Sequence, residues 1–410
     1  MPKIKPFKAI LPSTAFVREV VISLENLSIE SAKEIRGKNP HSFVHLLVPK
    51  IENYYLMGSK QELAFKKISE NLEDFLQNKV LVKDHEEAIY IYQQTSPKHQ
   101  YTGFWTVSSI DDYLSNQIKK HELTRAERER GLIEYVKETG LDANPVLITY
   151  PTQTDLEDII NQKTKEQPDL DFELDGVHHQ IWKINQPEEV KRVVDIFENM
   201  PVSYIADGHH RAAAASTFGI ERRKLNLKHQ GAEEYNFFSS VYISTNQLDI
   251  LAFHRFIKLN EDIHTKEILE FIKDKFNIKL IERNQILPQS EHVLGFYMDA
   301  QAYQIQLKSY LKEDILTDLD VSILQNEILE PLFQITNPRE DKRMHFIGGE
   351  INVTKQLELI DQGVYDLAFF LFPIAVSDLI KIADIGETMP PKSTWFEPKF
   401  LAGLVTHEIN

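Results

Sequence analysis

The segment YIADGHHRAAAA, residues 204–215, decides how the rest of the chain is interpreted. The apolar residues before Asp207 predict the end of a buried strand. Gly208 permits a sharp turn, and Ala212–Ala215 predicts a helix because alanine is the best helix former. The segment therefore predicts a strand, a tight turn and the start of a helix.

A helix start of this kind predicts an anion-binding site. The first N–H groups of a helix have no partner within it, and the helix dipole is positive at that end. Arg211 adds a charge in the first turn, while His209 and His210 can donate to phosphate oxygens or titrate near neutral pH. Asp207 can hold magnesium or accept the proton of a substrate hydroxyl. The alternative is structural: Asp207 caps the helix, Arg211 forms an ordinary ion pair and the histidines are satisfied polar residues.

A second cluster, IKKHELT at residues 118–124, joins a predicted strand to a predicted helix. Thr124 and Glu127 have the spacing of a capping box, which predicts that the helix begins there. Glu122 is a candidate general base, and His121 is a neighbour that can tune it. A solvated charged turn is the alternative.

A third cluster is GETMPPKSTWFEPK, residues 386–399. Lys392 and Thr394 can contact a phosphate, although no P-loop glycines precede them. A packed proline-rich loop is the alternative. The pair His178-His179 can join Asp207 in a zinc site only if further ligands converge, and nothing in the spacing requires this.

Composition limits the functions to consider. The 410 residues are enough for two or three domains, and 46 Lys and Arg against 62 Asp and Glu give a net charge of −16. A chain this acidic is not expected to bind nucleic acid broadly. The absence of cysteine excludes disulfides, thiolate metal sites and cysteine nucleophiles. No apolar run has the length of a signal peptide or a membrane span, so we expect a cytoplasmic protein that does not contact membranes.

Predicted strands outnumber predicted helices and often follow one another along the chain. This order predicts an α+β fold with mixed or antiparallel sheets and flanking helices. Strands are expected at 88–93, 101–110, 146–150, 179–184, 202–206, 237–243, 251–259, 293–298 and 303–307, and helices in the second half at 265–276 and 321–332. We expect one region at 1–258 and an α+β region at 259–410.

Several segments together carry a family resemblance. ADGHHR, IKKHELT, Asn39–Phe43 (NPHSF) and GETMPPKSTWFEPK resemble the bacterial and archaeal family known as domain of unknown function 1015. HQIWKI at 179–184, LAFHR at 251–255 and YDLAF at 365–369 follow in the expected order. The resemblance covers nearly the whole chain.

That family is similar to the ParB/sulfiredoxin-like superfamily, one branch of which comprises ADP-dependent kinases of free serine. The resemblance implies a ParB/sulfiredoxin-like core in the N-terminal half. It also implies that Gly208, His209, His210 and Arg211 bind the phosphates of a nucleotide. Glu122 is the match for the essential glutamate of the kinases. The sulfiredoxin cysteine has no counterpart in this chain.

The expected function is therefore a nucleotide-dependent phosphotransferase acting on a small hydroxylated metabolite such as a free amino acid. ADP or ATP with magnesium would be the cofactor, with magnesium on Asp207 and Glu122 accepting the hydroxyl proton. Lys392 and Thr394 would assist. The alternatives are a non-catalytic protein that senses a nucleotide or phosphate, and a metal-dependent hydrolase.

Overall fold

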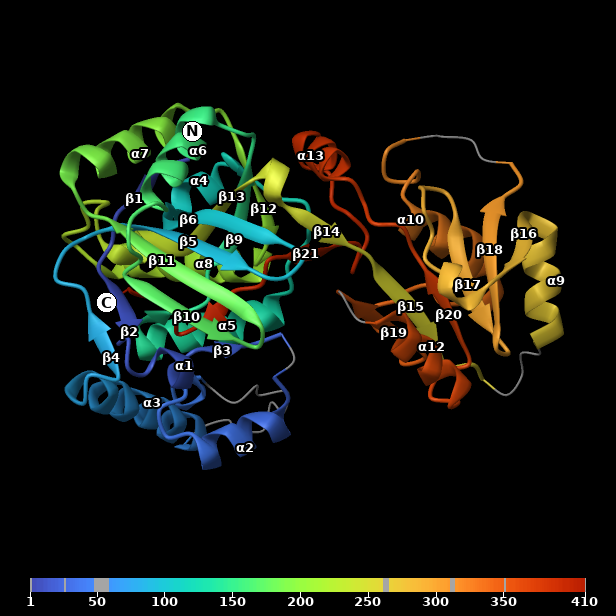
Figure 1. The fold of residues 1–410 in the computed structure, drawn as a ribbon, viewed down its shortest axis with the longest axis horizontal. Coiled ribbons are helices and arrows are strands. Elements are labelled where there is room, and N and C mark those ends of the chain that lie inside the picture. The colour runs from blue at the N-terminus through green and yellow to red at the C-terminus, as the bar shows by residue number, and fades with distance from the viewer. Residues whose placement is uncertain are drawn as a thin grey trace. The chain divides into compact units, whose positions relative to one another are not determined.

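The computed structural model describes residues 2–25, 27–47, 59–260, 265–309, 314–349 and 352–409. The chain divides into two compact units (Figure 1). Unit 1 comprises Met1–Leu248 and Pro398–Asn410, and unit 2 comprises Asp249–Glu397. The division comes at Leu248 instead of residue 258, and the segment from Pro398 onward is part of unit 1.

The centre of unit 1 is a nine-stranded sheet with the main order β10-β11-β5-β6-β13-β9-β12-β7, and β1 pairs with β6. Its strands are β1 (Ile4–Lys5), β5 (Ile89–Thr95), β6 (Gln100–Ser109), β7 (Ile118–Lys119), β9 (Val146–Tyr150), β10 (Leu170–Leu174), β11 (Val177–Ile184), β12 (Ser203–Asp207) and β13 (Phe237–Ser244). The pairs β12–β7 and β13–β9 are parallel, whereas the other pairs are antiparallel. The mixed α+β architecture predicted from the sequence is thereby confirmed.

Helices bury one face of this sheet. The helices of unit 1 are α1 (Val17–Val20), α2 (Ile29–Lys38), α3 (Ser59–Gln77), α4 (Ile110–Leu114), α5 (Ala126–Thr139), α6 (Thr154–Lys163), α7 (Pro187–Asn199) and α8 (His209–Leu225). Side chains of α4, α6, α7 and α8 join sheet residues in one hydrophobic cluster, to which α7 contributes Val193 and Phe197. Figure 1 shows α6 and α7 together over the sheet. Every residue of β13 is buried, as expected for a central strand.

A smaller four-stranded sheet in unit 1 has the order β4-β2-β23-β8. Its strands are β4 (Leu81–Lys83), β2 (Ala9–Pro12), β23 (Thr406–Glu408) and β8 (Leu141–Asp142), and a separate pair joins β3 (Ile22–Ser23) to β22 (Leu401–Ala402). Because β22 and β23 pair with strands from the first 150 residues, the segment after residue 398 is held in unit 1 by backbone hydrogen bonds.

Unit 2 contains a six-stranded antiparallel sheet of order β16-β18-β17-β20-β15-β19. Its strands are β15 (Phe253–Ile257), β16 (Phe276–Ile281), β17 (Leu294–Met298), β18 (Gln301–Leu307), β19 (Met344–Gly348) and β20 (Leu367–Phe370). Its helices are α9 (Thr265–Lys275), α10 (Asp320–Leu324), α11 (Glu330–Phe333), α12 (Val353–Asp361) and α13 (Val376–Asp384). A two-stranded ribbon of β14 (Asp249–Leu251) and β21 (Trp395–Glu397) lies at the two ends of the unit's sequence.

Two predicted elements differ from the structure in instructive ways. The helix expected at 321–332 contains a π-helical turn, η5 (Gln325–Leu329), between α10 and α11. Pro331 has no N–H to donate to the preceding turn, which favours such an irregularity. The strand expected at 251–259 is broken between Leu251 and Phe253, because β14 and β15 pair with different partners.

Candidate functional site

The turn between β12 and α8 has the predicted form. Asp207 ends the strand, and the helix begins at His209. Gly208 between them has a φ of +99°. A Cβ on Gly208 would lie 2.8 Å from Nη2 of Arg211. Glycine is therefore required here both by the left-handed backbone and by the guanidinium packed against the turn.

Arg211 is fixed by the loop that precedes β9. Its Nη1 donates to Oδ1 of Asn144 at 2.6 Å and also to the carbonyl of Pro145. Its Nη2 lies 3.6 Å from Oδ2 of Asp207, and the side chain is 22 % exposed. One edge of the guanidinium is thus held by the protein while the other faces Asp207.

Lys399 is a member of this site that the sequence analysis did not single out. Its Nζ donates to Oδ2 of Asp207 at 3.2 Å and lies 3.9 Å from Oε2 of Glu25. The lysine is the last residue of GETMPPKSTWFEPK, the same segment in which Lys392 is predicted to contact phosphate. Lys399 makes the β12–α8 turn more cationic than its own sequence suggests.

Asp207 is ionised and shared by two cations. Burial would raise the pKa of Asp207, but Lys399 and Arg211 together outweigh burial and hold that pKa below its ordinary value. The side chain remains 40 % exposed. Asp207, Arg211 and Lys399 alone carry one net positive charge, and Glu25 beside Lys399 balances it, so the cluster is neutral overall at a surface that solvent reaches.

These surroundings do not fit the magnesium site predicted on Asp207. Magnesium requires several oxygen ligands and strong negative charge, whereas Asp207 is already neutralised by Lys399 and Arg211. Among the described residues, no group of three or more His, Asp or Glu side chains is arranged to hold a metal. The two cations beside Asp207 are suited to contact an anion instead.

The loop after β7 lies against the first turn of α8. β7 and β12 are parallel neighbours, so the segments that follow them meet at one edge of the sheet. The backbone N–H of His121 donates to Nε2 of His209 at 3.4 Å, and that of Arg125 donates to Nδ1 of His210 at 3.3 Å. The structure therefore brings the first two sequence clusters together, with Glu122 in the loop between the two contacts.

The same contact explains how α5 begins. Thr124 does not cap the helix as the capping-box pattern predicts, since the N-cap is Arg125 and no side chain caps that end. Arg125 has an extended backbone with φ −110° and ψ 125°, and its N–H is used by His210. The contact with α8 thus takes the place of the local cap.

The two inner histidines are neutral. Burial lowers the pKa of His121 to about 4, opposed by the charge of Asp207. Burial also lowers the pKa of His209 well below its ordinary value, and the neighbouring His121 adds to this. Their rings meet edge to face with centroids 4.4 Å apart. His209 accepts a hydrogen bond at Nε2, so its role at this site is to hold the 118–125 loop in place.

The remaining predicted residues are not part of the β12–α8 turn. Lys392 and Thr394 belong to unit 2, where Nζ of Lys392 lies 4.8 Å from the ring centre of Phe253. Their proposed contact with phosphate remains a prediction. His178 and His179 lie on β11, five positions from β12 in the strand order, where His178 bonds Asp171 and His179 bonds Tyr92. In the described part of the chain they are not grouped with Asp207 in an arrangement that could hold a metal, so the structure does not support the zinc site that the sequence left open.

No helix in the described ranges is both long and apolar enough to cross a membrane.

Comparison with known proteins gives a family and three distant structural likenesses. No curated protein matches the sequence. A conserved hypothetical protein from Pyrococcus furiosus is 14 % identical, with 72 % of this chain and 91 % of that chain covered and a TM-score of 0.36. A free serine kinase in complex with AMP is 14 % identical, with 72 % and 88 % covered and a TM-score of 0.36. SbnI with a C-terminal truncation, from Staphylococcus aureus, is 11 % identical, with 73 % and 85 % covered and a TM-score of 0.36. Scores this low establish neither a shared fold nor a shared function.

Unlike these structural likenesses, the match of the sequence to a family model is strong enough to establish the family. The model of the family described as "Protein of unknown function (DUF1015)" matches residues 4–322, which is most of the chain. The chain therefore belongs to the DUF1015 family.

Proposed function

We propose that this protein is a nucleotide-dependent phosphotransferase acting on a small hydroxylated metabolite such as a free amino acid. The observation that carries the proposal is the contact of the 118–125 loop with the first turn of α8. This contact sets the segment of Glu122 beside a helix start at which two cations, Arg211 and Lys399, meet. Phosphoryl transfer depends most on two components. One is a general base that accepts the hydroxyl proton, and the other is a cationic group that binds the phosphate oxygens.

In this proposal, the phosphates of ADP or ATP lie at the start of α8. The first N–H groups of the helix and its dipole favour negative charge there. Arg211 is preorganised because Asn144 and Pro145 hold it. Lys399 has a flexible stem and three donors, so it can exchange part of its contact with Asp207 for a phosphate oxygen.

Glu122 accepts the proton of the substrate hydroxyl in this scheme. Phosphoryl transfer depends mainly on positioning and charge stabilisation, so a held arginine, a mobile lysine and one base are sufficient protein groups. Asp207 has no part as a metal ligand. Its carboxylate instead balances the charges of Lys399 and Arg211 until a phosphate takes its place.

A second candidate is a protein that binds a nucleotide without catalysis. It is favoured by one observation: the carboxylate nearest the turn, Asp207, is already paired with two cations, so chemistry would depend on Glu122. A sensor needs the cations but not Glu122, which separates the two functions experimentally.

The test is calorimetric titration with ADP and with ATP, each with and without magnesium. Wild-type protein is expected to bind at least one nucleotide. Lys399→Met is expected to weaken that binding about tenfold or more, the size of a lost charge-assisted hydrogen bond. Lys191→Met, which changes an exposed lysine on α7, is the matched control and should bind as wild type. Absence of binding by the wild type would contradict both candidates.

Glu122→Gln then distinguishes the enzyme from the sensor. Wild-type protein would be incubated with the bound nucleotide and a mixture of free amino acids, with phosphorylated products detected by phosphorus NMR. The enzyme predicts that Glu122→Gln retains nucleotide affinity and loses turnover by a factor of about 100 or more. Nucleotide binding without any product in the wild type would support the sensor.

A further inference from the structure

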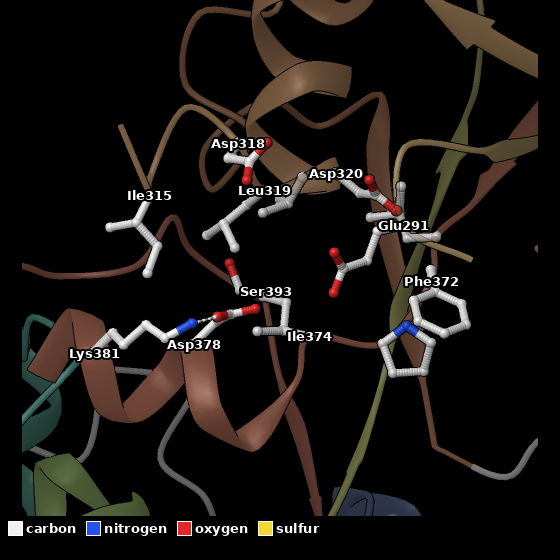
Figure 2. Close-up of a pocket in the computed structure, with 13 residues that line it drawn as sticks. Glu291, Ile315, Asp318, Leu319, Asp320, Phe372, Ile374, Asp378, Lys381 and Ser393 are labelled. Atoms are coloured by element: carbon white, nitrogen blue, oxygen red, sulfur yellow. Dashed lines mark hydrogen bonds and ion pairs between the residues drawn. The ribbon is translucent and has the colours of Figure 1, made fainter. Parts of the chain in front are cut away.

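Unit 2 contains a cavity of about 390 Å³ that plays no part in the proposed transfer (Figure 2). Residues from the segment before β17, the start of α10, the segment after β20, and α13 form its wall. Its lining residues are Glu291, Ile315, Asp318, Leu319, Asp320, Val321, Leu371, Phe372, Pro373, Ile374, Asp378, Lys381 and Ser393. Its volume lies within the range of small-molecule sites.

The wall combines an apolar surface with an excess of carboxylates. Four acidic residues line the cavity together with one lysine. Nζ of Lys381 lies 2.8 Å from Oδ1 of Asp378, so this lysine is already paired. Nε2 of His292 lies 2.9 Å from Oδ1 of Asp318. Within the described residues, Glu291 and Asp320 form no ion pair, and Figure 2 shows the carboxylate of Glu291 directed toward the open space of the cavity.

Asp320 is the most unusual group in the wall. Its residue is only 7 % exposed, and Oδ1 accepts a hydrogen bond from the backbone N–H of His292 at 2.7 Å. Oδ2 is buried and has no hydrogen-bond partner among the described residues. Leaving a buried carboxylate oxygen without a donor is unfavourable. Because solvent does not reach Oδ2, Asp320 attracts a ligand in the cavity through its negative charge.

The charged neighbours of Asp320 explain its protonation behaviour. Burial raises the pKa of Asp320 to about 6, and Glu291 adds to this effect, while the N–H and the charge of His292 oppose it. The N–H of Phe372 also favours the ionised form, although no hydrogen bond of normal geometry joins it to Oδ2. Carboxyl groups with a raised pKa in a cavity are common at functional sites.

The ligand chemistry follows from the arrangement of these groups. A metal ion needs several carboxylates converging on one point, and the described part of the chain has no such group. An anion would meet an excess of carboxylates. A cation with an apolar body would use both the carboxylates and the wall of Leu319, Val321 and Ile374.

We propose that this cavity binds a small organic ammonium, with the charged nitrogen near Asp320 and Glu291 and the hydrocarbon part against the apolar wall. The site is independent of the proposed transfer at the β12–α8 turn, because every lining residue belongs to unit 2. It gives this chain a binding site for a class of ligand that its family membership does not suggest.

The test compares n-pentylamine with n-pentanol, which has the same length but no charge. Calorimetric titration at pH 7.5 with full-length protein is expected to show saturable binding of n-pentylamine and at least tenfold weaker binding of n-pentanol. Asp320→Asn, which keeps the shape and removes the charge, is expected to weaken n-pentylamine binding tenfold or more. Glu267→Gln makes the same change in charge at an exposed position of α9 and should leave binding unchanged.

A second variant keeps the test decisive if Asp320→Asn does not fold. Glu291→Gln alters an exposed side chain at the cavity and is expected to weaken n-pentylamine binding about threefold to tenfold. Equal binding of the amine and the alcohol by the wild type would overturn the proposal. The same conclusion would follow if Glu291→Gln and a folded Asp320→Asn both bound n-pentylamine like the wild type.

Discussion

Gly208 determines the geometry of the candidate site at the scale of a single residue. Its positive φ turns the chain from β12 into α8, and its missing side chain leaves room for the guanidinium of Arg211. A change at Gly208 therefore acts on the backbone and on the cation at once.

We expect Gly208→Ala to destabilise the protein by about 1–3 kcal/mol and to weaken anion binding. Gly231→Ala is the matched control, because Gly231 has a φ of +91° but no atom within 4 Å of its Cβ position. The control carries the backbone strain without displacing Arg211, so it should lose stability and keep anion affinity. Urea unfolding and titration with pyrophosphate measure the two effects. Equal loss of affinity in both variants would show that contact with Arg211 is unimportant.

Asp207→Asn tests the role assigned to that carboxylate. Removing its charge leaves Lys399 and Arg211 without their shared anion, so pyrophosphate is expected to bind severalfold more tightly at low salt. Titration in 20 mM salt without magnesium measures this. Weaker pyrophosphate binding in Asp207→Asn would contradict the proposed arrangement of charges.

The local sequence predicted the residues of the turn but not their most distant partner. Asp207, Gly208 and Arg211 are neighbours whose chemistry follows from one strand end and one helix start. Lys399 is 192 positions away from Asp207, and no local pattern indicates that the two side chains meet. The magnesium prediction fits poorly for the same reason, since the cation that neutralises Asp207 comes from a remote part of the chain.

At the scale of elements, the pairing of β7 with β12 gives the site its second half. The two strands are short, and only two residue pairs align them in parallel. That alignment sets the loop containing His121 and Glu122 against the first turn of α8. Apolar patterns predicted most of the strands, but the order of strands in a sheet depends on contacts between distant segments.

Helix α8 lies unusually close to its neighbours at Gly219. A Cβ at this position would lie 2.4 Å from the carbonyl oxygen of Tyr235 and 2.4 Å from Cδ1 of Ile110. Gly219→Ala is therefore expected to destabilise the protein by about 1–3 kcal/mol through overpacking. Gly131→Ala in α5 faces open space and should stabilise it by about 0.5–1 kcal/mol. Chemical unfolding of both variants makes the comparison, and a stabilised Gly219→Ala would refute the close approach.

At the scale of the whole molecule, the two units differ in their sensitivity to acid. Among the described residues, unit 1 has three buried histidines with lowered pKa values, His121, His179 and His209. In the described part of unit 2, burial lowers the pKa of one histidine, His254, to about 3. Burial raises the pKa of Asp320 in unit 2 to about 6, which has the opposite effect on the stability of that unit. Burial also raises the pKa of Asp112 and of Asp142 in unit 1, which offsets part of the histidine effect there.

We expect unit 1 to lose stability before unit 2 as the pH falls from about 6.5 to 4. A histidine with a lowered pKa stays neutral in the folded state while the unfolded chain takes up a proton, so its contribution is present above pH 6.5 and lost below it. Asp320 binds its proton more tightly when folded, so unit 2 gains stability over part of the same range. Hydrogen exchange of β5 and β13 should rise earlier than that of β17 and β20. The reverse order would show that other groups dominate.

The α+β class was predictable from the alternation of strand-like and helical segments. The sequence analysis expected a boundary after residue 258, whereas the compact units divide after Leu248. No change in amino-acid composition marks Leu248, so the sequence could not locate this division. The return of residues 398–410 to unit 1 was also hidden from the sequence. It depends on the pairing of β22 and β23 with strands near the beginning of the chain.

Unit 2 is inserted into unit 1, and this affects the order in which the protein can mature. A ribosome delivers Lys399, β22 and β23 only after all of unit 2 has been synthesised. Unit 2 is one continuous segment of the chain, so it can fold before Lys399, β22 and β23 of unit 1 have been synthesised. During translation of residues 249–397, Asp207 therefore has no contact with Lys399. The ion pair between these two side chains at the β12–α8 turn forms only after unit 2 has been synthesised.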